Sequence, residues 1–516
     1  MDRRVRLRFA PSPTGPLHIG GVRTALYSYL YAKQKGGDFL LRIEDTDQTR
    51  FVPGAEEYII EALNWCGIKT DEGVGIGGKH APYRQSERKE SGIYKKYAEE
   101  LVNAGHAYYA FDTAEELDAA RKNAEVNGKS FSYNAQSRGQ LNNSLNLADD
   151  QVQTLLASTN YVIRLKVNAN EDVHLKDLIR GDVKFNSNIV DDKVLLKSDG
   201  MPTYHLAHIV DDYLMEITHA VRGEEWLPSA PAHVLIYQYL GWTDRMPLYA
   251  HLPLLLKPDG NGKLSKRDGD RLGFPVFPLE WKDPSGGEIS SGYREKGYEP
   301  EAFVNMLALL GWNPGTEQEI LSMSELIEKF SFEHVHKAGA KFNPEKTLWF
   351  NTQYVHHTAS SILADKLKTQ VTAALNLSEN DAKMQAHFLT AATDLIKPRV
   401  HFAHELYQTA PYLFSAPAEY DAQVIAKRWK PELHGFYEQL MIDFTALPEF
   451  NSVHADAQFK QSAADAGIKP GDVLQLFRVM LSGQGSGVDL FGMIALLGKD
   501  EVSARINKAL SHLKNK

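Results

Sequence analysis

Two short loops carry most of the residues whose types and spacing could do chemistry. The first, residues 8–21, reads Arg-Phe-Ala-Pro-Ser-Pro-Thr-Gly-Pro-Leu-His-Ile-Gly-Gly. A strand-like alternation precedes it, and apolar residues at helical spacing follow it. A loop between a strand and a helix N-terminus directs backbone N–H groups and the positive end of the helix dipole at one point, which favours phosphate. His18 adds a side-chain donor, although the glycines alone fit an ordinary turn equally well.

The second loop, residues 258–270, reads Pro-Asp-Gly-Asn-Gly-Lys-Leu-Ser-Lys-Arg-Asp-Gly-Asp. Lysines on a flexible loop can close over a triphosphate and stabilise the charge that accumulates in a transition state. Taken alone, the loop fits a solvated basic turn better. The chain has no Gly-x-x-x-x-Gly-Lys-Ser/Thr pattern, no serine-elbow motif and no histidine pair at metal spacing. A covalent or metal-hydrolytic mechanism therefore has little support. The candidate residues in this loop are Lys263, Ser265, Lys266 and Arg267.

Polar residues also follow three predicted strands, and ligands of open α/β sheets bind beyond the carboxyl ends of strands. If the strands are neighbours, two arginines and one glutamate converge over one cleft. Arginine can bind a carboxylate bidentately and a carboxylate can accept from an ammonium, so an amino acid with an acidic side chain would fit. Taken singly, Glu44 also fits a cap of the next helix, and the arginines also fit surface ion pairs. The strand-end residues are Arg8 and Ser12, then Glu44, then Arg222, Glu224, Glu225 and Trp226.

The order of the predicted elements is that of a parallel sheet with crossover helices, interrupted by an insertion. We expect a multidomain α/β plus all-α protein: a Rossmann-type parallel sheet with an α+β insertion, followed by a helical half. The last residues predict three closing helices, near 473–481, 490–497 and 502–513. The expected divisions are 1–108 and 204–256 for the two halves of the sheet domain, 109–203 for the insertion, 257–350 for the second loop and its following segment, and 351–516 for the helical half.

Composition restricts the class of protein. The 516 residues suffice for three or four domains, and the hydrophobic fraction of 43% with 24% charged residues is that of a soluble globular protein. No apolar run approaches the roughly 20 residues of a membrane span, and the N-terminus has no apolar signal core. The single cysteine, Cys66, excludes intramolecular disulfides and cysteine-rich zinc sites. A single cysteine without a disulfide partner fits a reducing cytoplasm. A net charge of −9 argues against nucleic-acid binding through overall charge, but not against a local basic surface.

Several motifs in order resemble one family. His18-Ile-Gly-Gly21 resembles the first signature of class I aminoacyl-tRNA synthetases, and Lys263-Leu-Ser-Lys-Arg267 resembles the second. The chain is more narrowly similar to the bacterial type of glutamyl-tRNA synthetase, and this similarity extends to Leu496-Leu-Gly-Lys-Asp near the end. The motifs that carry it are Ala10-Pro-Ser-Pro-Thr-Gly15, Arg42-Ile-Glu-Asp-Thr-Asp47, Pro82-Tyr-Arg-Gln-Ser-Glu-Arg88, Leu195-Leu-Lys-Ser-Asp-Gly200, Pro202-Thr-Tyr-His-Leu-Ala207 and Glu224-Glu-Trp-Leu227.

The resemblance implies ATP-dependent attachment of L-glutamate to the 3′ end of its tRNA through a glutamyl-adenylate. His18, Lys263 and Lys266 would be catalytic, and Mg²⁺ would enter with ATP. The implied ATP-binding residues are His18, Gly20, Gly21, Glu225, Leu256, Ser265 and Lys266. The implied glutamate-binding residues are Arg8, Ala10, Ser12, Glu44, Tyr204, His208 and Arg222.

The resemblance also assigns the remaining regions. The insertion would bind the tRNA acceptor end, residues 257–350 would contact the stem, and the helical half would read the anticodon. Arg399 lies near the place where family members carry an anticodon-reading arginine. A monomer is the family expectation. Candidate phosphate contacts, each of which also fits a solvated helical face, are Lys397, Arg399, Lys427, Arg428, Trp429, Lys430, Arg478 and Arg505.

Departures from the family pattern affect three positions or regions. Gly21 stands where many class I enzymes have a second histidine, and His208 stands where many relatives have asparagine. The insertion lacks the cysteines through which some relatives bind zinc, so no zinc is expected. The segment 274–297 is longer than the usual connection, and the sequence assigns it no function.

Other functions remain as alternatives. A glutaminyl-tRNA synthetase typically has Pro-Pro-Glu-Pro-Asn-Gly in the first loop, where this chain has Ala10-Pro-Ser-Pro-Thr-Gly15. A glutamyl-tRNA synthetase that also charges glutamine tRNA is a second alternative. A tRNA-modifying relative lacks the helical half, a nucleotidyltransferase with a similar loop is usually much shorter, and a non-catalytic RNA-binding protein would not need both Lys263 and Lys266.

Overall fold

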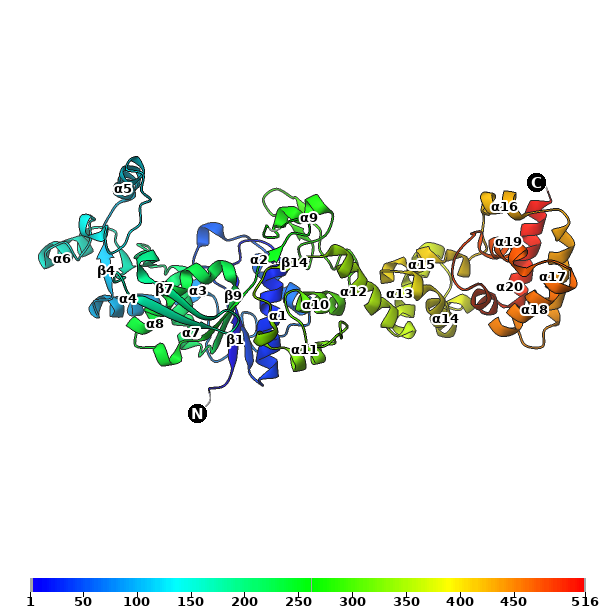
Figure 1. The fold of residues 1–516 in the computed structure, drawn as a ribbon, viewed down its shortest axis with the longest axis horizontal. Helices are drawn as coiled ribbons and strands as arrows, with labels where there is room; N and C mark the ends of the chain where they lie inside the picture. Colours follow the sequence, from blue (N-terminus) through cyan, green and yellow to red (C-terminus); the bar gives the residue numbers. More distant parts are fainter. Residues whose placement is uncertain (1–2, 261, 515–516) are drawn as a thin grey trace. The chain divides into compact units, whose positions relative to one another are not determined.

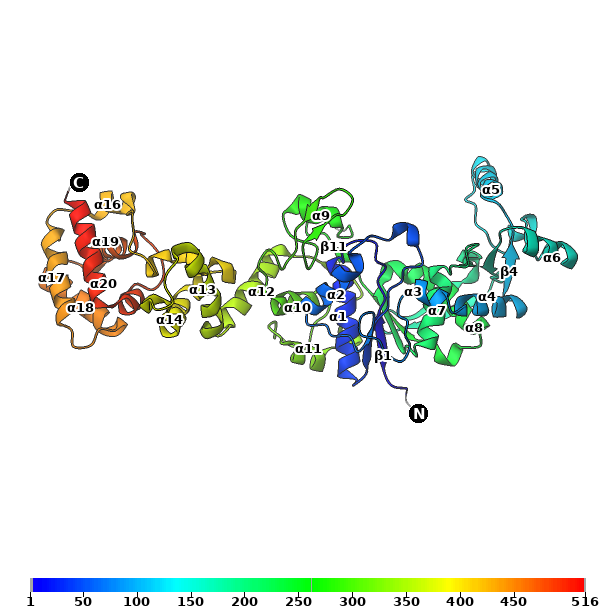
Figure 2. The same ribbon diagram turned by 180° about the vertical axis from the view of Figure 1, so that it is seen from behind.

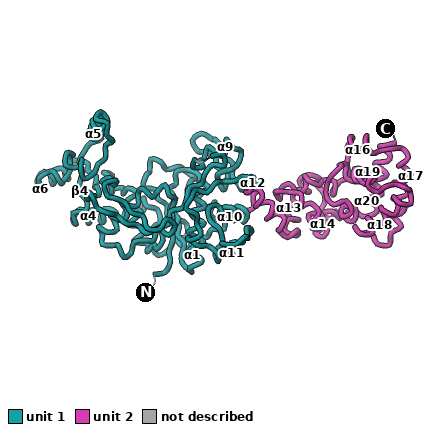
Figure 3. Tube along the Cα trace, viewed as in Figure 1, with its two compact units in different colours: residues 1–296, 300–344 teal, residues 297–299, 345–516 magenta. Residues whose placement is uncertain are grey.

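The computed structural model describes residues 3–260 and 262–514, which fall into two compact units (Figure 3). The first unit comprises the chain up to Lys296 together with Pro300–Pro344. The second comprises Gly297–Glu299 and the chain from Glu345 onward.

A seven-stranded sheet forms the centre of the first unit, in the order β3-β2-β1-β9-β10-β6-β7. Every pair of neighbours is parallel except β6 and β7, which are antiparallel. The predicted parallel sheet is therefore confirmed. The strands β2, β1 and β9 are neighbours, which is the condition for the polar residues at their carboxyl ends to converge. The strands are β1 (Arg6–Phe9), β2 (Asp38–Leu41), β3 (Glu72–Gly73), β6 (Asp172–Asp177), β7 (Gly181–Asn186), β9 (His219–Gly223) and β10 (Leu248–Leu252).

Helices pack against this sheet because successive side chains of a strand point to opposite faces. Phe9 lies within reach of Gly21 in α1, whereas Arg8 bonds to Asp212 in α7. The helices α4, α7 and α8 share one hydrophobic core with β6 and β10. Both faces of the sheet are thus covered (Figures 1 and 2). The helices of this region are α1 (Ile19–Gln34), α2 (Ala55–Trp65), α3 (Gln85–Lys89), α4 (Ile93–Asn103), α7 (Tyr204–Leu214) and α8 (Ala230–Tyr239).

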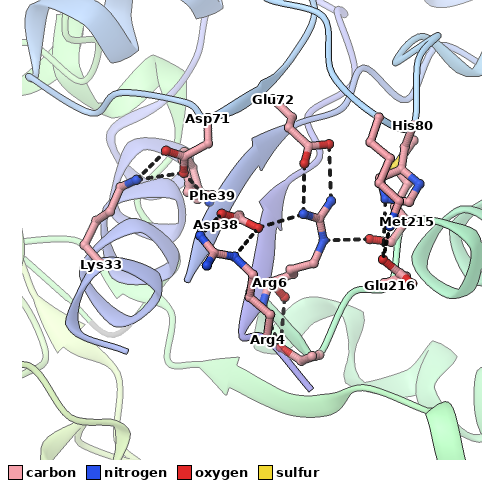
Figure 4. Close-up of polar contacts among 12 residues, drawn as sticks. Arg4, Arg6, Lys33, Asp38, Phe39, Asp71, Glu72, His80, Met215 and Glu216 are labelled. Atoms are coloured by element: carbon pink, nitrogen blue, oxygen red, sulfur yellow. Dashed lines mark hydrogen bonds and ion pairs between the residues drawn. The ribbon is translucent and has the colours of Figure 1, made fainter. Parts of the chain in front are cut away.

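The start of β1 and β2 is fixed by an ion network (Figure 4). Arg6 Nη1 lies 2.8 Å from Asp38 and 2.9 Å from Glu72, and its Nε donates to the carbonyl of Met215 at 3.0 Å. Arg4 adds a second cation on Asp38 at 2.6 Å. These contacts join β1, β2 and β3 to the end of α7, at the opposite end of the strands from the polar loops.

The strands between β4 and β8 belong to two different sheets. β4 (Ala107–Ala110), β5 (Val162–Leu165) and β8 (Val194–Leu196) form a separate antiparallel sheet beside α5 (Ala114–Val126) and α6 (Asp149–Ser158) (Figure 1). β6 and β7 instead extend the central sheet through β10, where Tyr249 is paired with Asp177. Both strands lie within the predicted insertion 109–203, and the sequence did not predict that they join the main sheet.

Short elements complete the first unit. β11 pairs with β14, and the segment 274–297 contains the hairpin of β12 and β13, in which Trp281 packs edge-on against Tyr58. This hairpin lies over α2, which gives the long segment a packing role. The elements are β11 (Leu255–Leu256), α9 (Lys266–Leu272), β12 (Trp281–Lys282), β13 (Ile289–Ser290), α10 (Pro300–Leu309), α11 (Met323–Lys329) and β14 (Ala340–Lys341).

The second unit is helical and has its own hydrophobic core. Gly498 has a φ of 80°, which interrupts α20 and divides it into the last two predicted closing helices. The helices are α12 (Pro344–His357), α13 (Ser360–Leu375), α14 (Ala386–Ile396), α15 (Leu406–Thr409), α16 (Ala422–Arg428), α17 (Leu433–Ala446), α18 (Ser452–Asp465), α19 (Pro470–Ser482) and α20 (Leu490–Leu513).

Candidate active site

A cavity of about 470 Å³ lies at the carboxyl ends of β1 and β9, and both polar loops line it. The structure therefore brings together loops that are about 250 residues apart in the chain. Leu256 and Ser265 do not line the cavity: Leu256 pairs with β14, and Ser265 bonds to Asp268 at the start of α9. Of the other candidates, Glu224 and Arg267 do not line it either. The predicted residues that do line it are Arg8, Ala10, Ser12, His18, Gly20, Gly21, Glu44, Tyr204, His208, Arg222, Glu225, Trp226, Lys263 and Lys266.

His18 precedes the first turn of α1 and lines the cavity. The backbone N–H of Gly20 donates to Nδ1 of His18 over 3.1 Å, so the proton of the neutral ring is on Nε2. That Nε2 is buried and makes no hydrogen bond among the described residues. Burial, followed by the charges of Lys266 and Lys263, lowers the pKa of His18 to about 4. The ring is thus a neutral hydrogen-bond donor at neutral pH.

Gly21 occupies the position at which many class I enzymes have a second histidine. A Cβ on this residue would lie 2.5 Å from Cδ1 of Leu17 and 3.8 Å from the ring of Phe9. A larger side chain therefore requires Leu17 to move. Close packing of α1 against its own loop accounts for the glycine.

The second loop places two ammonium groups at the cavity. Lys266 is the first residue of α9, and its Nζ lies 3.3 Å from the position that a Cβ on Gly15 would occupy. Partial desolvation lowers the pKa of Lys266. Lys263 Nζ pairs with Glu225 Oε1 at 2.7 Å. Both cations lie close to the N-terminus of α1, where an anion is also favoured by the helix dipole.

Glu44 is held as a carboxylate by buried Arg42 and by His208. Arg42 Nη2 donates to its Oε1 at 2.7 Å, and Nδ1 of His208 lies 3.4 Å from the same oxygen. Burial works to raise the pKa of Glu44, but Arg42 and His208 outweigh it and the net effect lowers the pKa. No helix-capping bond from Glu44 is present among the described residues, which excludes the alternative of a helix cap.

Arg8 and Arg222 are both buried, so neither is a surface ion pair. Arg8 Nε lies 2.9 Å from Asp212 Oδ1, and Arg42 Nη1 shares that oxygen at 2.8 Å. Arg222 bonds instead to two imidazoles and to the hydroxyl of Tyr204.

The sequence did not identify four residues that hold this site, Arg42, Asp212, His233 and His251. Arg42 directly follows the apolar residues of β2, and Asp212 is in an acidic doublet on α7 that is fully buried. A charge at such a position signals a buried partner, but the sequence does not say which one. The two histidines are on α8 and β10, far in the chain from the arginine that they contact.

Comparison with known proteins assigns the chain to a family. Residues 4–349 match the family "tRNA synthetases class I (E and Q), catalytic domain", and residues 363–510 match "Anticodon binding domain". The chain is 54% identical to the glutamate--tRNA ligase of Parabacteroides distasonis and 53% identical to that of Flavobacterium johnsoniae, in each case over 99% of this chain and all of the relative. The crystal structure of a glutamate tRNA ligase from Elizabethkingia meningosepticum in complex with its amino acid is similar at a TM-score of 0.91 and 47% identity, covering 99% of this chain and all of that one.

The first unit is therefore a class I aminoacyl-tRNA synthetase catalytic unit. Over its full length, the chain belongs to the glutamate--tRNA ligase family. Enzymes of this class use ATP together with Mg²⁺. In the described ranges 3–260 and 262–514, no helix combines the length and apolarity needed to cross a bilayer.

The basic residues of the second unit differ in exposure. Arg399 is exposed in the turn Lys397–Arg399. Arg505 is 1% exposed, and its Nη1 donates to the carbonyls of Tyr412 and Leu481 at 2.7 and 2.8 Å. The hypothesis that Arg505 contacts tRNA phosphate is wrong, because its guanidinium is used to satisfy buried carbonyls.

Proposed function

We propose that this chain attaches L-glutamate to the 3′ end of its tRNA in two steps. The observation that carries the proposal is the division of one cavity into two chemically different ends. One end has the Nε2 donor of His18 with Lys263 and Lys266, and the other has Arg8, Arg222 and the carboxylate of Glu44. The first suits a triphosphate and the second suits an acidic amino acid.

In the first step, a glutamate α-carboxylate oxygen attacks the α-phosphorus of ATP and pyrophosphate leaves. His18 and Lys266, with the backbone N–H groups of α1, stabilise the negative charge that accumulates on the phosphates. Lys263 exchanges its pairing with Glu225 for the departing pyrophosphate. Mg²⁺ arrives with ATP. The chain supplies position and charge and no covalent nucleophile.

In the same step, Glu44 accepts from the α-ammonium of the substrate, since Arg42 and His208 keep it ionised. Ser12, Ala10, Tyr204 and His208 line the remainder of the amino-acid end. In the second step, a hydroxyl of the terminal adenosine attacks the carbonyl carbon of the adenylate, and AMP leaves.

The regions outside the cavity are assigned by family. We propose residues 109–203 for the acceptor end of the tRNA, the part of 257–350 that follows the lysine loop for the stem and 351–516 for the anticodon, with Arg399 as an anticodon contact. We further propose a cytoplasmic monomer; size-exclusion chromatography at assay concentration tests the oligomeric state.

ATP–pyrophosphate exchange in the presence of tRNA tests the proposal. We expect glutamate, but not glutamine, to support exchange, and we expect glutamate tRNA to accept labelled glutamate. Exchange with glutamine alone would overturn the assignment in favour of a glutaminyl-tRNA synthetase. Charging of both glutamate and glutamine tRNAs with glutamate would instead show a non-discriminating enzyme.

A further inference from the structure

The two arginines that face the amino-acid end of the cavity are held in opposite ways. Arg8 is paired with the carboxylate of Asp212 at 2.9 Å. Arg222 makes no ion pair among the described residues: its Nε donates to Nε2 of His251 at 2.9 Å, and its Nη1 lies 3.1 Å from Nδ1 of His233. Nη1 also lies 3.1 Å from the hydroxyl of Tyr204.

These contacts determine the protonation of both rings. A guanidinium only donates, so Nε2 of His251 is an acceptor and its proton is on Nδ1. That Nδ1–H donates to Asp177 Oδ2 at 2.5 Å, and Asp177 is fixed in turn by the backbone N–H groups of Ile179 and Arg180.

The second ring follows the same rule. Nδ1 of His233 accepts from Arg222, so the proton of this ring is on Nε2, which lies 3.2 Å from Nδ1 of His205. Burial and the neighbouring charge of Arg222 lower the pKa of His233 well below its usual value, and burial also lowers the pKa of His251. Both imidazoles are therefore neutral at neutral pH.

The guanidinium is consequently buried with its positive charge uncompensated. Arg222 is 6% exposed, and its Nη2 is buried and makes no hydrogen bond among the described residues. Arg222 also lines the cavity. A buried charge of this kind is costly until a counter-ion binds, and a carboxylate supplies both the acceptor and the charge. A carboxamide oxygen supplies the acceptor only.

We propose that His233 and His251 are positioning residues that determine substrate specificity. By holding Arg222 through neutral acceptors, they reserve its charge for the side-chain carboxylate of glutamate and disfavour glutamine. This inference rests on the proposed function. The charge of Asp177 orients His251 without a direct pairing to the arginine.

A pair of nearly isosteric variants separates charge from shape. In His233→Asn the side-chain oxygen replaces the Nδ1 acceptor and stays neutral, whereas His233→Asp adds a carboxylate at the same place. We expect His233→Asn to retain KM for glutamate within about threefold. We expect His233→Asp to raise that KM, and to lower the glutamate-to-glutamine ratio of kcat/KM, by about tenfold or more, with KM for ATP unchanged.

A second pair of variants, at His251, tests the inference independently. His251→Gln keeps an acceptor near the Nε2 position and should rescue the loss of glutamate affinity caused by His251→Leu. His219→Gln is a matched control, because His219 is a buried histidine of β9 that contacts Thr218 outside the cavity. Thermal unfolding of each variant verifies that it is folded.

The outcomes distinguish the inference from the proposed function. Equal behaviour of His233→Asn and His233→Asp, or a glutamate-to-glutamine ratio that does not change in His233→Asp, would overturn the inference. A parallel rise in KM for ATP would also overturn it, because that result indicates general distortion of the cavity. Failure of the unmodified protein to activate glutamate would refute the proposed function itself.

Discussion

Gly20 and His18 form a hydrogen bond across the first turn of α1, 3.1 Å from the backbone nitrogen to Nδ1, and this contact leaves Nε2 as the protonated nitrogen of the neutral ring. His18 thus supplies the hydrogen-bond donor, and the backbone N–H of Gly20 fixes which ring nitrogen carries the proton. The contact converts a titratable side chain into a fixed neutral donor.

Replacement of His18 should impair the activation step. His18→Ala removes the donor, and we expect ATP–pyrophosphate exchange to fall by about 10²–10³-fold, the usual cost of losing one donor to a developing charge. His18→Gln, which can place an amide N–H near the same point, should lose less. Exchange assays over a range of ATP concentrations measure both effects; equal losses in the two variants would contradict the assigned role.

Lys266 should matter through its charge. Lys266→Ala is expected to lower kcat for exchange by orders of magnitude, about 10²-fold or more, whereas Lys266→Arg should retain part of the activity. Lys282→Ala, on the exposed hairpin of β12, is the matched control and should behave as the unmodified protein does. Near-normal exchange by Lys266→Ala would remove this residue from the mechanism.

The buried cation Arg42 should be important for stability. It is fully buried and pairs with Glu44 at 2.7 Å and Asp212 at 2.8 Å. Arg42→Met leaves charged carboxylates buried with one cation fewer, and we expect a loss of about 3–5 kcal/mol in the free energy of unfolding. Arg121→Met, which breaks the exposed pair with Asp118, should cost about 0–1 kcal/mol.

Urea unfolding that follows the catalytic unit measures this difference. The two variants share the same substitution, but Arg42 is buried among several carboxylates and Arg121 forms one exposed pair. Similar losses in both would show that the Arg42 network contributes no more than a surface ion pair.

Stability should decrease as the pH falls from about 6.5 to about 4. Burial lowers the pKa of His18, His205 and His219 to about 4 from 6.5. Between these values the unfolded chain binds more protons than the folded chain, so stability rises with pH. Each histidine contributes up to about 3 kcal/mol, which is fully present above pH 6.5 and lost as the pH falls through about 4.

Urea midpoints at pH 7, 6 and 5 test this dependence. The variant His219→Gln removes one of the three titrations and should show a shallower decrease than the unmodified protein. An identical pH dependence would show that His219 titrates alike in the folded and unfolded chains.

The strand ends illustrate what local sequence can predict. Arg8 and Arg222 lie near the carboxyl ends of β1 and β9, and Glu44 follows β2. The carboxyl ends of parallel strands meet at one edge of a sheet. Their convergence needed only the adjacency of β2, β1 and β9, which the structure shows. The phosphate-binding character of the first loop is similarly local, since it depends on a helix N-terminus.

Pairing between distant segments has no such local signal. The residues of β6 and β7 lie within the predicted insertion 109–203, yet β6 pairs with β10 in the central sheet. The periodicity of a segment predicts a strand but does not select its partner. Arg505 shows the same limit, because helical spacing does not reveal which basic residue turns inward to bind buried carbonyls.

The sequence by itself determined which groups are available: a loop predicted to bind phosphate, a lysine loop and polar groups at three strand ends. The tertiary structure decided how those groups are charged. It gave Arg8 a carboxylate and Arg222 two neutral imidazoles, from residues far away in the chain. The physical reason is that charge compensation in a buried site depends on distances between side chains, and only the folded chain sets those distances.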